Sequence, residues 1–130
     1  MPNKSRFFLF ILLQLFFFCS DAQNPHLQFD HIGAAEGLSL NNVESIIQDN
    51  RGFMWFGTPD GLNKYDGYRF TVFKTDLSDT NSISNNYIRS IAKSKNGDLW
   101  IATMGGGICL YDHNKENFTR YRHNAKNSNS

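Results

Sequence analysis

Arg51-Gly52-Phe53-Met54-Trp55-Phe56-Gly57-Thr58 is repeated further along the chain as Asn96-Gly97-Asp98-Leu99-Trp100-Ile101-Ala102-Thr103. The two tryptophans are 45 residues apart, and the same spacing aligns a set of upstream residues pair by pair. These pairs are Leu38 with Ile83, Ser39 with Ser84, Asn41 with Asn86, Val43 with Ile88, Ser45 with Ser90 and Ile46 with Ile91. Self-similarity at a fixed period indicates an architecture built from structural repeats.

Each repeat contains four short runs with the composition of β-strands, separated by Asn, Asp and Gly. Downstream of the tryptophan, Tyr65-Asp66 aligns with Tyr111-Asp112, and Phe70 aligns with Phe118. The predicted strands of the first repeat are Val43–Gln48, Phe53–Thr58, Leu62–Tyr65 and Arg69–Phe73. Those of the second repeat are Tyr87–Lys93, Asp98–Ala102, Gly107–Tyr111 and Asn117–Arg122.

Four antiparallel strands in every 40 to 50 residues is the arrangement of a β-propeller blade. An immunoglobulin-type sandwich would spread about seven strands over ~100 residues without such a repeat, so it fits less well. We therefore predict an all-β fold, a partial β-propeller with two four-stranded antiparallel blades. The first blade repeat covers residues 37–81. Residues 82–130 contain the second blade repeat and the start of the next one.

The segment before the first repeat contains Phe29-Asp30-His31-Ile32, which resembles the last strand of each unit. A lone strand at the N-terminus could complete the final blade of a ring and close the circle. We therefore predict that residues 23–36 supply a closing strand.

The first 22 residues have the composition of a signal peptide. Lys4 and Arg6 precede an apolar run from Phe7 to Phe18, and small residues follow at Ser20-Asp21-Ala22, so we expect cleavage after Ala22. Twelve helical residues rise about 18 Å, which is short of a roughly 30 Å hydrocarbon core. Lipidation of Cys19 is the alternative, although Phe18 stands where lipid-attachment sequences have a small residue. The domain is predicted to be exported.

Charge and cysteine content exclude several classes of function. Without residues 1–22 the chain keeps 11 of its 13 basic and 11 of its 12 acidic residues, a balance that argues against a nucleic-acid partner. Cleavage would leave Cys109 as the one cysteine, so no intramolecular disulfide is expected. In its strand-like run, Cys109 is interpreted as a small buried residue, with a reactive thiol as the alternative.

The aromatic and turn residues that recur in both repeats are interpreted as structural. Repeated aromatics in propellers pack one blade against the next, so we expect Trp55 and Trp100 in the core rather than on a sugar ring. The predicted blade core is Trp55, Thr58, Gly61, Tyr65, Phe70, Trp100, Thr103, Tyr111 and Phe118.

The sequence contains no recognisable catalytic or metal-binding pattern. Its histidines (His26, His31, His113 and His123) lack the spacing of a metal site. Asp49-Asn50-Arg51-Gly52 lacks the alternating oxygen ligands of a calcium loop and is predicted to be a turn. We therefore expect no cofactor, no metal and no catalytic residue in this chain.

The motif from Gly37-Leu38-Ser39 through Gly52-Phe53-Met54-Trp55-Phe56-Gly57-Thr58 to Gly61-Leu62 and Tyr65-Asp66-Gly67 resembles the two-component regulator propeller repeat. The resemblance covers residues 29–130. The second copy departs from the pattern, because Ser94 replaces Asp49, Ala102 replaces Gly57, and Gly105-Gly106-Gly107 contains one added residue.

The resemblance implies a role in signal reception. Such repeats build the periplasmic sensor region of hybrid two-component histidine kinases, whose parent chain is anchored in the cytoplasmic membrane and often responds to a carbohydrate fragment. An oligosaccharide is thus the expected ligand, and the loops Pro59–Asn63 and Met104–Gly107 are candidates to border its site. The alternatives are the N-terminal part of an exported propeller enzyme, such as a polysaccharide lyase or hydrolase, and a gene fragment without function.

Two blades leave apolar surface uncovered, because repeats of this kind generally need three or more units for a continuous core. Burial of several hundred Å² of apolar surface is worth on the order of 10 kcal/mol, similar to the total stability of a domain, about 5–15 kcal/mol. The expected partners are therefore further blades of the same parent chain, and the isolated chain is expected to be marginally stable or to self-associate.

Overall fold

The burial pattern along the strands shows that both sides of each sheet carry side chains that are at least partly buried. Successive side chains of a strand point to opposite sides of the sheet, and in Leu99–Thr103 buried and half-buried residues alternate. A computed structural model describes residues 28–123 of the protein. The predicted signal peptide, His26, Cys19 and residues 124–130 of the expected next repeat lie outside the described residues.

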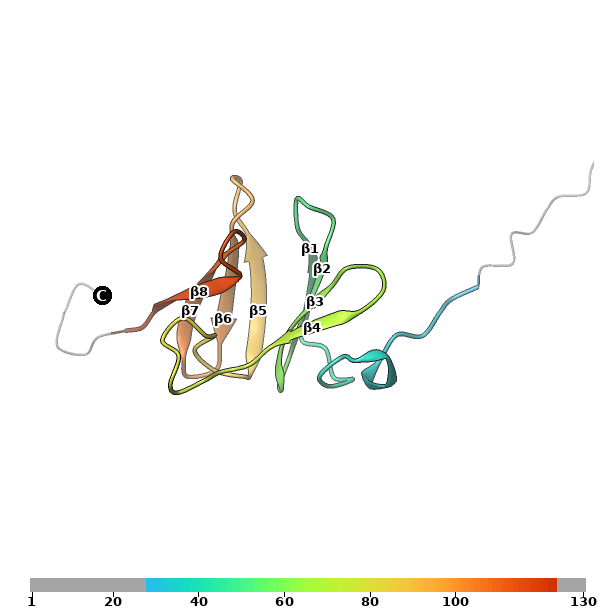
Figure 1. Ribbon diagram of the computed structural model, residues 1–130, viewed down its shortest axis with the longest axis horizontal. Helices are drawn as coiled ribbons and strands as arrows, with labels where there is room; N and C mark the ends of the chain where they lie inside the picture. The colour runs from blue at the N-terminus through green and yellow to red at the C-terminus, as the bar shows by residue number, and fades with distance from the viewer. Residues whose placement is uncertain (1–27, 124–130) are drawn as a thin grey trace, which may run out of the picture. The chain divides into compact units, whose positions relative to one another are not determined.

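Blade 1 is a four-stranded antiparallel sheet in which each strand pairs with the next along the chain (Figure 1). Its strands are β1 (Ser45–Gln48), β2 (Met54–Thr58), β3 (Gly61–Tyr65) and β4 (Phe70–Phe73). Blade 2 has the same topology, with β5 (Ile88–Lys93), β6 (Leu99–Thr103), β7 (Gly107–Asp112) and β8 (Asn117–Tyr121).

The prediction of an all-β fold with two four-stranded blades is confirmed, and every strand end lies within two residues of the predicted one. The largest difference is at β1, which begins at Ser45 instead of Val43, because the ladder with β2 starts at the pair of Ser45 and Gly57.

Glycine is required at the turns that lead into β3 and β7. Gly61 has a φ of 138° and Gly107 a φ of 83°, conformations that residues with a side chain rarely adopt. Space is limiting as well, since a Cβ on Gly61 would lie 3.0 Å from the carbonyl oxygen of Phe73, and one on Gly107 would clash with that of Tyr121. The outer strands β4 and β8 therefore run close to these turns.

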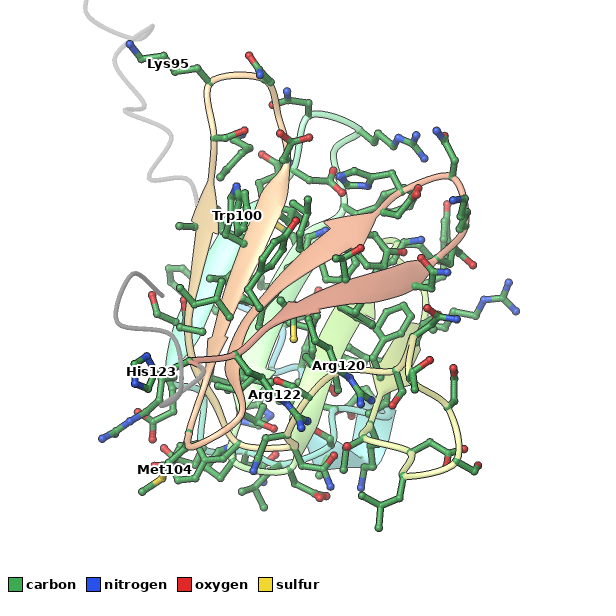
Figure 2. All side chains as sticks on the ribbon, turned by 90° about the vertical axis from the view of Figure 1, so that its left-hand side faces the viewer. Lys95, Trp100, Met104, Arg120, Arg122 and His123 are labelled. Carbon is green, nitrogen blue, oxygen red and sulfur yellow. The ribbon has the colours of Figure 1, made fainter. Side chains whose placement is uncertain are left out.

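The two sides of each blade differ chemically. We call the side with Trp55 or Trp100 the tryptophan face, and the side with Ile46 or Ile91 the isoleucine face. The tryptophan face of blade 1 packs against the isoleucine face of blade 2, and Trp55 and Ile91 belong to one buried cluster. The other two faces are open: Ile46 is 57% exposed, and Trp100 is half-buried on the outward side of blade 2 (Figure 2).

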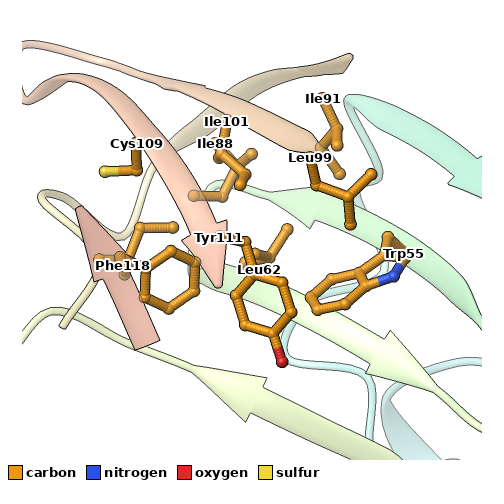
Figure 3. Packing of buried hydrophobic residues seen from close by; sticks show 10 residues of the cluster. Trp55, Leu62, Ile88, Ile91, Leu99, Ile101, Cys109, Tyr111 and Phe118 are labelled. Atoms are coloured by element: carbon orange, nitrogen blue, oxygen red, sulfur yellow. The ribbon is translucent and has the colours of Figure 1, made fainter. Parts of the chain in front are cut away.

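The packed faces form the seam between the blades, and most of the core lies in it. The fully buried Trp55 ring meets the edge of Tyr111 at a centroid distance of 4.7 Å and stacks on Phe73 at 5.8 Å. The buried apolar residues around the seam, many of them shown in Figure 3, are Trp55, Leu62, Ile83, Ile88, Ile91, Leu99, Ile101, Cys109, Tyr111 and Phe118.

Gly57 allows the seam to close. A Cβ on this residue would lie 2.6 Å from Cγ2 of Ile88, so only glycine lets β2 approach β5 this closely. Beside this contact, the amide of Ile91 donates to the hydroxyl of Ser45 at 3.1 Å, and the Lys93 ammonium donates to the Gln48 carbonyl at 2.9 Å. Apolar packing and polar pairing thus fix the same register between the blades.

The described residues before blade 1 form one short element, the 3₁₀ helix η1 (Ala34–Glu36). Gly33 donates its amide to the Glu36 carboxylate at 2.6 Å, and Ala34 donates to the side chain of Asn41 at 2.7 Å. Residues 28–32 have no regular secondary structure, so their predicted role as a closing strand stays a prediction. Within residues 28–123, no helix has the length and hydropathy needed to cross a membrane.

The seam predicts unequal costs for two equivalent truncations. Trp55→Ala should lower the free energy of unfolding by about 3–5 kcal/mol, because it empties a fully enclosed site. Trp100→Ala, at the same repeat position on an open face, should cost about 1 kcal/mol, since part of the ring is already in water. Urea unfolding of both variants at one protein concentration measures the difference. Equal losses would show that the two tryptophans have equivalent surroundings.

Candidate functional site

A buried hydrogen-bond cluster, which we call the latch, ties the start of each repeat to the turn between its second and third strands. In blade 1 the hydroxyls of Ser39 and Thr58 lie 2.8 Å apart, and Asn63 donates from Nδ2 to the Ser39 hydroxyl at 2.9 Å. The Ser39 amide donates back to Oδ1 of Asn63 at 2.9 Å. Thr58 also donates to the Gly61 carbonyl at 3.1 Å and accepts from the Asp60 amide at 3.0 Å.

Blade 2 has the same latch with one substitution. The hydroxyls of Ser84 and Thr103 lie 3.0 Å apart, and Thr103 donates to the Gly107 carbonyl at 3.1 Å. Cys109 takes the place of Asn63: its thiol donates to the Ser84 hydroxyl at 3.1 Å, and the Ser84 amide donates to its sulfur at 3.4 Å. Cys109 is fully buried, as expected for a small core residue, but it also has a polar role in the latch.

The latches hold both predicted ligand loops at equivalent turns of the two blades. In Pro59–Asn63 the side chains of Leu62 and Asn63 are completely buried, so only the first part of this loop faces solvent. In Met104–Gly107, Met104 and Gly105 are exposed, and Met104 projects at the lower end of the view in Figure 2.

At the opposite ends of the strands, a buried carboxylate organises the turn between β1 and β2. Asp49 accepts hydrogen bonds from the amides of Arg51 at 2.9 Å and Phe53 at 3.0 Å, and from the indole nitrogen of Trp55 at 2.8 Å. The predicted turn is confirmed by the hydrogen bond from the Gly52 amide to the Asp49 carbonyl. Asp49 thus positions the tryptophan that fills the seam.

An ion pair between Lys64 of blade 1 and Glu116 of blade 2 spans the seam near this turn. Lys64 in β3 donates to the Glu116 carboxylate at 2.7 Å, and this hydrogen bond lowers the pKa of Glu116. The Lys64 ammonium also lies 4.6 Å from the centre of the Phe53 ring. Burial raises the pKa of the neighbouring Tyr111 hydroxyl, and the Glu116 carboxylate adds to the rise. The ion pair of Lys64 with Glu116 thus links blade 1 to blade 2 electrostatically.

The predicted core residues lie in two environments. Six are buried: Trp55, Thr58, Gly61, Thr103, Tyr111 and Phe118. Three are half-buried because they belong to faces that no other blade covers in this structure: Tyr65, Phe70 and Trp100. Tyr65 and Phe70 pack on each other at 4.7 Å, and Trp100 lies 5.6 Å from Tyr121 of its own blade.

Sequence reasoning missed the latch, although its signal was present. Ser39 precedes Thr58 by 19 residues, and Ser84 precedes Thr103 by the same number, so each hydroxyl pair recurs at one spacing. The histidines at 31, 113 and 123 form no metal-ligand group, and none is found among residues 28–123.

The latches coincide with the part of the sequence that matches a known family. The model of the two component regulator propeller matches residues 37–60 and 82–105, stretches that contain both hydroxyls of each latch. Each blade thus contains a stretch that matches the two component regulator propeller repeat. The matched stretches thus include the hydroxyls that fasten each blade's entry segment to its β2–β3 or β6–β7 turn.

The chain is similar to parts of three larger proteins. Histidine kinase P4 of Formosa agariphila is 43% identical over 63 residues, 48% of this chain and 5% of that protein. The extracellular domain of BT3049, assigned as a hybrid two-component system of B. thetaiotaomicron, is 36% identical and superposes with a TM-score of 0.69. That of BT4673 from the same organism is 28% identical with a TM-score of 0.59.

This chain corresponds to a small part of the length of these relatives. The superpositions include 75% of this chain and 14% of the BT3049 domain, and 74% of this chain and 14% of the BT4673 domain. Because those domains are described as extracellular, the similarity supports an exported location for this chain.

The latch predicts the effect of an isosteric change. Thr58→Val keeps the side-chain shape but removes the hydroxyl that binds Ser39, Asp60 and Gly61, which should lower the free energy of unfolding by about 1–3 kcal/mol. Hydrogen exchange at the Asp60 amide should accelerate with it. Thr71→Val, on the exposed outer strand β4, is the matched control and should change stability by less than about 0.5 kcal/mol. Unchanged exchange in Thr58→Val would contradict the latch.

Proposed function

We propose that this chain is the N-terminal part of a periplasmic ligand-sensing propeller in a hybrid two-component sensor histidine kinase. The observation that supports this most strongly is the superposition on the BT3049 extracellular domain at 36% identity over three quarters of the chain. In the proposed parent, the N-terminal segment directs export, the blades lie outside the cytoplasmic membrane, and a kinase lies inside it.

The carboxylates whose pKa is shifted in the described part of the chain are not suited to act as general acids. A general acid needs a raised pKa, whereas the pKa values of Asp66, Asp76 and Asp112, like that of Glu116, are lowered. A backbone hydrogen bond from Arg69 is the main cause for Asp66, and one from Asn114 is the main cause for Asp112. For Asp76 the main cause is the hydroxyl of Ser78. These groups cap turns and stay ionised.

We propose an oligosaccharide as the ligand, bound at the propeller edge that carries the latched turns. The near-balanced charge of the chain suits a neutral ligand better than a strongly charged one. The exposed parts of this edge, including Pro59-Asp60 and Met104-Gly105, would border the site, with further blades of the parent supplying the rest.

The contacts offer a route for the signal. A ligand shifts a conformational equilibrium only by binding one state more tightly than another. The latch connects a turn to the entry of its own blade, and the seam connects that blade to the next through Trp55 and the Lys64–Glu116 pair. A displacement of one turn would therefore change the position of the neighbouring blade, because the latch and the seam connect the two.

The proposal is tested in the organism that carries the gene. Transcription is measured genome-wide after growth on each of a panel of purified oligosaccharides and on glucose, in the parent strain and in a strain with the chromosomal substitution Gly57→Val. This substitution forces the seam apart and should abolish induction by one of the sugars.

Leu77→Ser, at a fully exposed position, is the control and should keep the response. Immunoblotting of the exported protein shows whether each variant accumulates. Two results would contradict the proposal: induction by every sugar unaffected by deletion of the gene, or cleavage of the sugar by the purified protein, which would indicate a propeller enzyme.

A further inference from the structure

We propose that Glu44, Tyr87 and Arg89 form a sugar-binding subsite, and that this subsite takes an uncharged sugar unit with neighbouring hydroxyl groups. The inference rests on the proposed function, because it names the residues that would recognise the saccharide. Arg89 lies in the inner strand β5, and Glu44 and Tyr87 directly precede β1 and β5. The subsite is therefore built where the two blades of this chain meet, and it does not depend on the faces that further blades would cover.

The subsite lies at the inner end of the seam, on the edge that carries the latched turns. β5 packs against β1 and β2 of the other blade, and β1 and β5 face each other in Figure 1. The blades of a propeller are arranged around a central channel. The Met104 amide in the β6–β7 turn donates to the Tyr87 carbonyl at 2.9 Å. The subsite thus adjoins one of the turns proposed to border the ligand.

Tyr87 is fixed by its backbone and brings two charged groups together. Its amide donates to Oδ1 of Asn85 at 2.9 Å, and its carbonyl accepts the Met104 amide. Its hydroxyl donates to the Glu44 carboxylate at 3.3 Å. The guanidinium carbon of Arg89 lies 5.5 Å from the centre of its ring. One aromatic side chain therefore places an acceptor group of blade 1 and a donor group of blade 2 beside each other.

The two charged groups approach Tyr87 without neutralising each other. In the part of the chain that the structure describes, Glu44 and Arg89 form no ion pair, and the Arg89 guanidinium forms no hydrogen bond. Both side chains are exposed. Arginine has five N–H donors in a planar arrangement, and a carboxylate can accept more hydrogen bonds than the two that Glu44 receives from Tyr87 and Asn42. A ligand that both donates and accepts can therefore bridge them.

An irregularity of β5 is located at Arg89. Ile88 pairs with Thr103 and Ser90 pairs with Ala102, so Arg89 has no partner residue in β6. Such irregularities change the direction of a side chain and are frequent next to functional sites. In this blade the irregularity occurs at the residue whose guanidinium covers the Tyr87 ring.

The repeat separates these residues from those that the fold needs. Glu44 and Arg89 occupy the same repeat position, 45 residues apart, as do Asn42 and Tyr87. The seam tryptophan and its counterpart are identical in both blades, whereas the charge at this position is reversed. In each blade the earlier residue supports the charged one: Asn42 donates to Glu44 at 3.2 Å, and Tyr87 lies beneath Arg89. Packing of the blades therefore does not dictate which charge stands at this position.

A carboxylate and a guanidinium beside one aromatic ring suit a neutral sugar better than an acidic one. A hydroxyl group both donates and accepts, so one sugar hydroxyl can donate to Glu44 while its neighbour accepts from Arg89. A uronate could bind Arg89 through its carboxylate, but its charge would then lie close to that of Glu44, and like charges placed together disfavour binding. The chemistry of the subsite therefore points to an uncharged sugar unit.

Induction of transcription in the organism that carries the gene provides the test. The probes are neutral trisaccharides of xylose, mannose, glucose and galactose, with trigalacturonate as the acidic comparison. The chromosomal substitutions Glu44→Leu and Arg89→Met each remove one charged group at similar size. Each should raise the sugar concentration for half-maximal induction about tenfold or more, because hydrogen bonds to charged groups contribute that much to affinity.

Two further strains keep the test sharp. Arg69→Met is the matched control, because the Arg69 side chain is 84% exposed at the β3–β4 turn on the opposite edge, and it should leave the half-maximal concentration unchanged. Tyr87→Phe keeps the ring and the backbone contacts and removes only the hydroxyl that binds Glu44, so it should raise the concentration about threefold. Immunoblotting shows whether each variant accumulates, and Tyr87→Phe decides the question if a charge variant does not.

The outcomes separate this inference from the proposed function. If deletion of the gene leaves induction by every sugar unchanged, the proposed function and the subsite are both wrong. If induction requires the gene but is unaltered in Glu44→Leu, Arg89→Met and Tyr87→Phe, the subsite alone is wrong. Gene-dependent induction by trigalacturonate and by none of the neutral sugars would overturn the assignment of an uncharged ligand.

Discussion

The close approach of β2 to β5 at Gly57 is the constraint on which the rest of the structure depends. Because this residue has no side chain, Ile88 can lie against the backbone of blade 1, and the two sheets come near enough to enclose Trp55. Asp49 fixes the indole from one side, and Tyr111 contacts it from the other. The hydrogen bonds across the seam have suitable geometry only at this separation.

The latch and the seam stabilise different parts of the structure. The latch is local: it connects the start of a repeat to a turn of the same blade through hydroxyl groups, and it tolerates the exchange of Asn63 for Cys109 because both can bond to the serine. The seam is not local, because it brings residues of two blades together, as Gly57 and Ile88 show.

Much of the fold could be predicted from the sequence, because the repeat spacing indicates the number of blades and the alternation of apolar residues indicates the strands. The 45-residue period located both tryptophans and the strands around them. The period could not show that Trp55 is enclosed while Trp100 is partly open, since the two have the same local sequence and differ only in which side has a neighbouring blade. Burial of equivalent residues is decided by their position in the array.

The candidate site was harder to predict for a related reason. Chemical motifs are recognised from unusual residue types, and the latch of blade 1 consists of serine, threonine and asparagine, which are common in turns. Only the repetition of the Ser39–Thr58 spacing at Ser84 and Thr103 distinguishes it. The loops Pro59–Asn63 and Met104–Gly107 were predicted to border a ligand site, and in the first of them Leu62 and Asn63 are completely buried in the core and the latch.

The central claim is that the blades are joined by complementary side-chain volume at one point, and a double-mutant cycle tests it most directly. Gly57→Ala, Ile88→Ala and the double variant are unfolded in urea, and the coupling free energy is calculated. The account predicts that Gly57→Ala destabilises the protein by about 1–3 kcal/mol in the unchanged background and by much less in the Ile88→Ala background, which lacks the Cγ2 atom that a Cβ at position 57 would meet. Strictly additive losses would contradict it, because they would mean that the two residues do not compete for the same space.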